Sequence, residues 1–109
     1  MAFKLVKRNK LPVRVKGTIP DEDGNPVAFD FTLHCKRLTQ DEIDAVKTDG
    51  GSIKGFVHHV AEGWDTVVDD KGSQVPFDHE QLDQVIGNPG MPMLVMRSYL
   101  EQVSATAKN

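Results

Sequence analysis

Residues 11–35, "LPVRVKGTIPDEDGNPVAFDFTLHC", carry the clearest secondary-structure pattern in the chain. Apolar and polar residues alternate through each half of it, in residues 11–19 and again in residues 27–35. A period of two places the apolar side chains of a segment on one face, which is typical of a half-buried β-strand. The linker between the halves is rich in turn-forming residues and contains Asp23-Gly24-Asn25. We therefore predict an antiparallel β-hairpin over residues 11–37.

This hairpin needs a cover, because a two-stranded ribbon alone is only marginally stable in water. Its second strand presents Phe29, Phe31 and Leu33 on one face, and helices or a second chain must pack there. Residues 1–10 precede the hairpin as a basic lead-in that either frays or forms a further edge strand.

Two helices are predicted to follow the hairpin. Thr39 and Glu42 have the spacing of a capping box, and the helix that they open turns Ile43 and Val46 inward and ends at residues 49–51. Ser52 then caps a second helix that ends at Gly63. Its apolar residues recur at the spacing of one helical stripe, namely Ile53, Phe56, Val57, Val60, Ala61 and Trp64.

A short ribbon near residues 64–77 is predicted next, with a tight turn at Asp70-Lys71-Gly72-Ser73. We interpret it as an elbow that seats Trp64 and Phe77 in the core. Asp78 caps a third helix, and Pro92 lies in the first turn of a fourth. The third helix buries Leu82, Val85 and Ile86. The fourth carries Met93, Met96, Leu100 and Val103 on one face, which Leu94, Val95 and Tyr99 widen.

Together these elements predict an α+β fold in which an N-terminal antiparallel β-hairpin packs with about four α-helices. Residues 1–109 form a single domain, with the helical part at 39–104 and a flexible tail at 105–109. The apolar arc of the last helix is broad for so short a helix, so this helix is either central to the core or half of an interface.

Composition narrows the class of function. The chain has 109 residues, is 39% hydrophobic and 27% charged, and carries a formal net charge of -3. The charge gives no basic footprint for nucleic acid, and no apolar run approaches the ~20 residues that span a bilayer. Cys35 is the only cysteine, which excludes a disulfide within the chain and favours a reducing cytosol. We expect a partner that is neither nucleic acid nor membrane.

The densest cluster of polar candidates is His58-His59 with Glu62 and Asp65. Adjacent histidines point about 100° apart on a helix, so they do not form the i, i+4 pair that would chelate one metal ion. Asp69, Asp70 and His79 add no closed ligand set or acid and base pair at a known spacing. We expect one histidine at the core edge and the other solvated, and we predict no catalytic, metal or cofactor site.

Partner-binding residues are expected on the last helix, because thioether side chains adapt to varied apolar partners. Our candidates are Met93, Met96, Tyr99 and Leu100, followed by Trp64 and Phe77. The competing interpretation is that these are ordinary core residues.

Residues 60–109, "VAEGWDTVVDDKGSQVPFDHEQLDQVIGNPGMPMLVMRSYLEQVSATAKN", have a distinctive order of features. A Gly-Trp pair at Trp64 precedes an acidic-glycine turn and a Pro-Phe pair at Phe77, and then come a helix, a break at Pro89 and a last helix with Tyr99. This order resembles the bacteriophage tail assembly chaperones. The segment "FDFTLHCKRLTQDEID", residues 29–44, is similar to the strand of that family that runs into a Thr-capped helix.

The resemblance implies a non-enzymatic protein of the host bacterial cytoplasm. Such proteins bind the tape measure protein, help to bring major tail tube protein subunits to it, and are not retained in the mature virion. Homo-oligomers through the same apolar surfaces are expected. Many members also have a frameshifted long form, and Ala107-Lys108-Asn109 is compatible with a slippery codon run.

Two alternatives come from other classes of protein. A structural tail-completion or head–tail joining protein would stay in the virion, where mass spectrometry would detect it. A small metal-dependent enzyme using His58, His59, Glu62 and Asp65 would retain stoichiometric metal after dialysis.

Overall fold

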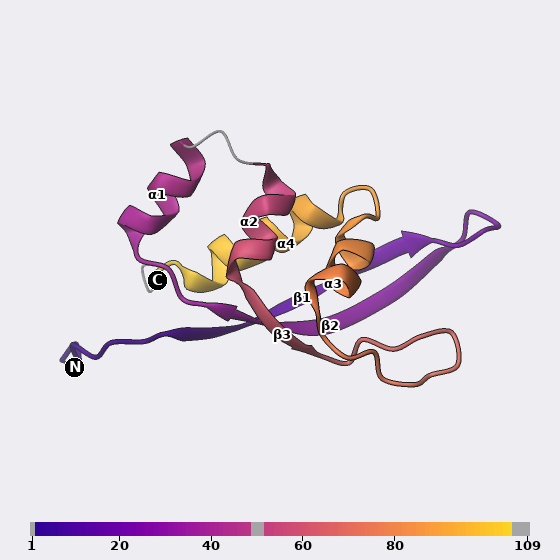
Figure 1. Ribbon diagram of the computed structural model, residues 1–109, viewed down its shortest axis with the longest axis horizontal. Helices are drawn as coiled ribbons and strands as arrows, with labels where there is room; N and C mark the ends of the chain where they lie inside the picture. The colour runs from indigo at the N-terminus through magenta and orange to yellow at the C-terminus, as the bar shows by residue number, and fades with distance from the viewer. Residues whose placement is uncertain (1, 49–51, 106–109) are drawn as a thin grey trace.

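The computed structural model describes residues 2–48 and 52–105, which form a sheet with helices on one side (Figure 1). The sheet is antiparallel with the strand order β1-β2-β3. The elements in chain order are β1 (Lys10–Pro20), β2 (Pro26–Lys36), α1 (Gln40–Thr48), α2 (Ile53–Val60), β3 (Ala61–Asp65), α3 (His79–Ile86) and α4 (Met91–Val103). The α+β prediction, with an N-terminal hairpin and about four helices, is confirmed.

The hairpin has the predicted strands and turn. β1 and β2 pair along their whole length, so the alternating apolar residues of both strands share the face that the helices cover. At the turn, the Asp21 carboxylate accepts hydrogen bonds from the amides of Asp23 and Asn25, both at 2.9 Å. Gly24 has a φ of 83°, a left-handed conformation that glycine adopts without steric cost.

The third strand was not predicted. Helix α2 ends at Val60, three residues before the expected end at Gly63, and the chain continues directly as β3. Trp64 therefore lies opposite Leu33 in the sheet and does not belong to the helix. The open edge of β2 supplies backbone partners that a longer helix would leave unpaired, and Gly63 is a poor helix former.

The outer edge of β1 is closed at one position by a side chain from α4. The amide of Arg14 donates to Gln102 Oε1 at 3.0 Å, and Gln102 Nε2 donates to the Arg14 carbonyl oxygen at 3.0 Å. The Gln102 side chain thus takes the place that a neighbouring strand would occupy, which blunts an exposed sheet edge.

The predicted helix caps are present. Thr39 and Glu42 form a reciprocal capping box, with bonds of 3.0 and 3.3 Å, and the hydrogen bond from Thr39 lowers the pKa of Glu42. Ser52 and Asp78 accept from the amides of Gly55 and Gln81. The ribbon turn also forms as predicted, with a bridge between Val68 and Gln74. The predicted end of α1 at residues 49–51 lies outside the described residues.

The hydrophobic core lies between the sheet and the helices. No polar or charged residue is buried among the described residues. The core residues with 0% exposure are Val13, Val15, Leu33, Val57, Val60 and Tyr99. The phenol of Tyr99 accepts a hydrogen bond from the Leu38 amide at 2.9 Å and donates to the Lys36 carbonyl oxygen at 2.8 Å, which joins α4 to the end of β2.

The predicted lead-in and tail lie on either side of the regular elements. Residues 2–9 form neither helix nor strand, so they extend the chain without adding the edge strand that was one of two expectations. The carbonyl oxygen of Asn9 accepts from the Arg37 amide at 2.9 Å. Of the predicted flexible tail, residues 106–109 lie outside the described residues.

Candidate functional site

Helix α4 has two apolar faces, which explains its broad apolar arc. Met91, Val95 and Tyr99 recur every four residues and are buried against the rest of the molecule. Met93, Met96 and Leu100 lie on a second face that keeps contact with solvent, and Met93 is 45% exposed. Helix α4 thus packs one apolar face into the core and leaves the other, with Met93, Met96 and Leu100, toward solvent.

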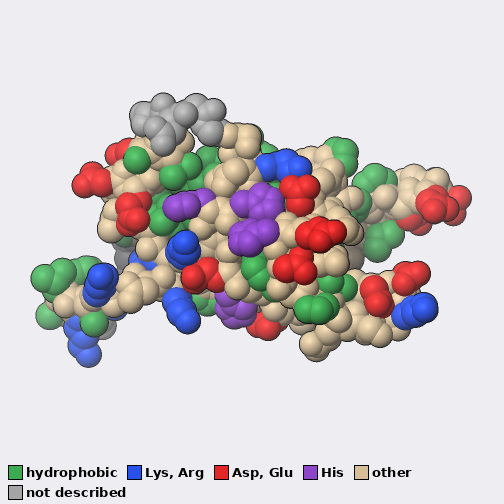
Figure 2. Space-filling view, in the orientation of Figure 1, with side chains coloured by type: hydrophobic (Ala, Val, Ile, Leu, Met, Phe, Trp, Pro, Cys, Tyr) green, Lys and Arg blue, Asp and Glu red, His purple; other side chains and the backbone are tan. Residues whose placement is uncertain are grey.

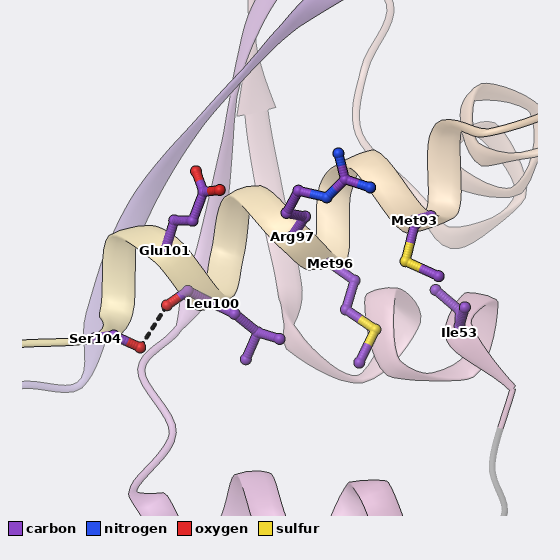
Figure 3. A pocket seen from close by; sticks show the side chains of 7 residues that line it. All are labelled: Ile53, Met93, Met96, Arg97, Leu100, Glu101 and Ser104. Carbon is purple, nitrogen blue, oxygen red and sulfur yellow. Dashed lines mark hydrogen bonds between the residues drawn. The ribbon is translucent and has the colours of Figure 1, made fainter.

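This outer face lines a groove of about 720 Å³, which Figure 3 shows from close by. The side chain of Met93 points toward Ile53 at the start of α2, and Met96 and Leu100 project from α4 on the same side. The charged ends of Arg97 and Glu101 project away from Met96 and Leu100 and form a polar border. The result is an apolar groove with charges along one side.

Three of the candidate partner-binding residues meet in this groove: Met93, Met96 and Leu100. Tyr99 does not join them, because it is fully buried and its hydroxyl is engaged by the backbone on the other side of α4. Ile53, which the sequence placed in the apolar stripe of the second helix and not among the partner-binding candidates, also lines the groove. Val95 and Tyr99 have the same four-residue spacing as Met96 and Leu100, so the spacing alone does not distinguish the inward face of α4 from the outer one.

Trp64 and Phe77 form a separate pair at the elbow. Their rings make a T-shaped contact at 5.0 Å, and Trp64 Nε1 donates to the Val75 carbonyl oxygen at 2.8 Å. Both side chains are partly buried against the core. The predicted elbow is thus present, with β3 in place of the end of a helix, and neither residue lines the groove on α4.

The histidines take up the arrangement expected of them, and Figure 2 shows histidine side chains gathered near the middle of one face. His58 is half-buried and His59 is exposed. His58 Nδ1 lies 3.0 Å from His79 Nδ1, and His58 Nε2 lies 3.1 Å from Asp83 Oδ1. The hydrogen bonds from His58 and then Lys54 lower the pKa of Asp83.

Sequence spacing did not indicate this cluster, because α2 and α3 bring it together. The other metal-ligand candidates are elsewhere. Asp65 pairs with His34 at 2.7 Å, across the sheet from the His58 cluster. Within residues 2–48 and 52–105, no three His, Cys, Asp or Glu side chains are grouped as metal ligands would be.

Cys35 lies in β2 with 1% exposure. Burial, followed by the charge of Glu62, raises the pKa of its thiol to about 12, which keeps it protonated and unreactive. Cys35 is thus a small buried residue of β2.

No protein-family model, curated protein sequence or solved structure matches this chain significantly. In the part of the chain that the structure describes, every helix is too short or too polar to cross a lipid bilayer.

Proposed function

We propose that this protein is a non-enzymatic phage tail assembly chaperone that acts in the host bacterial cytoplasm. It binds the tape measure protein, helps to recruit major tail tube protein subunits, and leaves before the virion is complete. The proposal starts from the order of features in residues 29–44 and 60–109 that resembles this family.

The observation that carries the proposal is the groove on α4. An amphipathic helix binds by laying apolar side chains spaced three or four residues apart into such a groove, while its polar face stays in water. Met93 and Met96 supply unbranched thioether side chains that fit apolar partners of different shape. Arg97 and Glu101, at the polar border, match a ligand that carries both signs of charge.

The test is affinity capture of the tagged protein from phage-producing cells, followed by mass spectrometry of the eluate and of purified virions. We expect the tape measure protein and tail tube subunits in the eluate and no bait in the virions. A bait retained in virions would instead identify a structural tail-completion or head–tail joining protein.

A matched pair of variants connects the test to the groove. Met93→Asp places a charge in the groove, and we expect it to weaken capture by about tenfold or more, as truncation of an interface anchor does. Gln84→Asp places the same charge at an exposed residue of α3 outside this groove, and should leave capture unchanged. Equal capture by both variants would rule out the groove as the binding site.

A further inference from the structure

The segment that precedes β1 carries the three most exposed large hydrophobic residues of the described chain. Phe3, Leu5 and Val6 are 85%, 95% and 55% exposed. The segment projects from one end of the molecule, at the far left of Figure 1, and shows hydrophobic and basic side chains together in Figure 2. We call residues 3–8 the arm. Surface of this kind is normally covered by a partner.

The opposite end of the molecule has an apolar groove that the helices leave open. The far half of the hairpin extends beyond the helical layer, so Ile19 and Phe29 are only partly covered. Together with the ribbon and the end of α3 they line a groove of about 430 Å³. Val68 within it is 53% exposed, and Val27, which pairs with Ile19 on the same sheet face, is 51% exposed. We call this the distal groove.

Charge distinguishes the arm from the surroundings of the distal groove. Residues 1–10 contain four basic and no acidic residues, whereas residues 11–109 contain nine basic and sixteen acidic residues. The acidic residues flank the distal groove on both sides, with Asp21, Glu22 and Asp23 at the hairpin tip and Asp69 and Asp70 at the ribbon tip. Figure 2 shows these two acidic tips at the end away from the arm.

The arm of a molecule does not reach the far end of its own distal groove. The groove runs along the hairpin from Phe31, which pairs with Val15, to Ile19, which lies nine residues from Lys10 or about 30 Å along a strand. From Lys10 back to Phe3 is seven residues, at most about 25 Å when fully extended. In addition, the bond from the Arg37 amide to the Asn9 carbonyl directs the arm away from the sheet.

We propose that the arm of one molecule occupies the distal groove of a second copy of this chain. Phe3 and Leu5, two residues apart, lie on the same side of an extended arm and enter the groove together. Lys7 and Arg8 then lie beside the acidic tips. This contact joins opposite ends of two molecules and involves neither the groove on α4 nor its proposed ligand.

The test is analytical ultracentrifugation of the full chain from about 1 µM to about 1 mM, the range over which weak contacts dissociate. We expect concentration-dependent association that weakens as salt rises, because exposed charges are then screened. Phe3→Ser with Leu5→Ser should weaken it at least tenfold. Gln84→Ser, at an exposed residue of α3 outside both grooves, should leave it unchanged.

A charge exchange distinguishes this contact from unspecific aggregation. One variant carries Lys7→Glu with Arg8→Glu, and the other carries Glu22→Lys with Asp23→Lys. Each should associate more weakly alone than the wild type does, because the attraction between the arm and the acidic tips is reversed or lost. A mixture should associate better than either component, because the unchanged arm of one variant meets the unchanged groove of the other. All four residues are exposed, so we expect these substitutions to leave the fold intact.

Three outcomes would overturn the proposal. They are a wild-type chain that stays monomeric to about 1 mM, a mixture that associates no better than its components, and a monomer whose arm binds anionic lipid vesicles. The last result would assign the arm to a lipid surface.

Discussion

Replacing Tyr99 with phenylalanine tests how the structure joins α4 to the sheet. The phenol bonds to the Leu38 amide at 2.9 Å and to the Lys36 carbonyl oxygen at 2.8 Å, and the side chain is 0% exposed. Tyr99→Phe removes one oxygen and keeps the ring, so the T-shaped contact with Phe56 at 5.3 Å should remain.

The expected cost comes from the group that is left unpaired. The hydrogen bond to Leu38 is buried, and an unsatisfied buried donor costs about 1–3 kcal/mol. The bond to Lys36 is only partly buried, so water can replace much of it. We expect Tyr99→Phe to lower the free energy of unfolding by about 2 kcal/mol, which for a chain of this length lowers the Tm by about 8 °C.

The assay is urea unfolding followed by the fluorescence of Trp64, with thermal unfolding alongside. Ser98→Ala is the matched control, because it removes a hydroxyl from the adjacent residue of α4 that bonds only to the Leu94 carbonyl oxygen of the same helix. It should change the free energy of unfolding by less than about 0.5 kcal/mol. If Tyr99→Phe were as stable as Ser98→Ala at an unchanged m-value, the argument from the buried amide would be refuted.

Three further predictions concern the sheet and the elbow. Because burial raises the pKa of the Cys35 thiol to about 12, its contribution to stability is complete below the unfolded pKa near 9 and is lost as pH rises through 12. Urea titrations across this range should show that loss, and Cys35→Ala should reduce it. Trp64→Phe leaves the Val75 carbonyl oxygen without its 2.8 Å donor, and circular dichroism should show a stability loss of about 1–2 kcal/mol. Gly17→Val should cost about 1–3 kcal/mol in the same assay, since a Cβ at residue 17 would lie 3.1 Å from the ring of Phe29; an unchanged Tm would mean that the ring moves freely.

The hairpin, the caps and the turns were predictable because their causes are local. Alternation in residues 11–35, the capping pair Thr39 and Glu42, and Asp78 before α3 each act on residues a few positions away. Such short-range preferences can be predicted from the sequence without knowledge of the tertiary contacts.

Strand β3 was not predictable in this way. Residues 53–64 keep a continuous helical stripe, yet Ala61–Asp65 pairs with β2 across about thirty residues of chain. Whether residues 61–65 form a helix or a strand depends on the open edge of β2, which is a property of the tertiary structure. Tyr99 was a partner-binding candidate but is buried in the core, for a related reason. An apolar arc wide enough for two faces does not reveal which face the sheet will cover.

The Gln102 side chain fixes the position of α4 relative to the hairpin. Both of its amide atoms bond to the backbone of Arg14, while two and six residues earlier the same helix presents Leu100 and Met96 to the groove. Sliding or rotating α4 to admit a ligand must therefore either break two hydrogen bonds at the sheet edge or carry β1 along. A ligand that displaced α4 would therefore free the Arg14 amide, and hydrogen exchange at that single position would report the displacement.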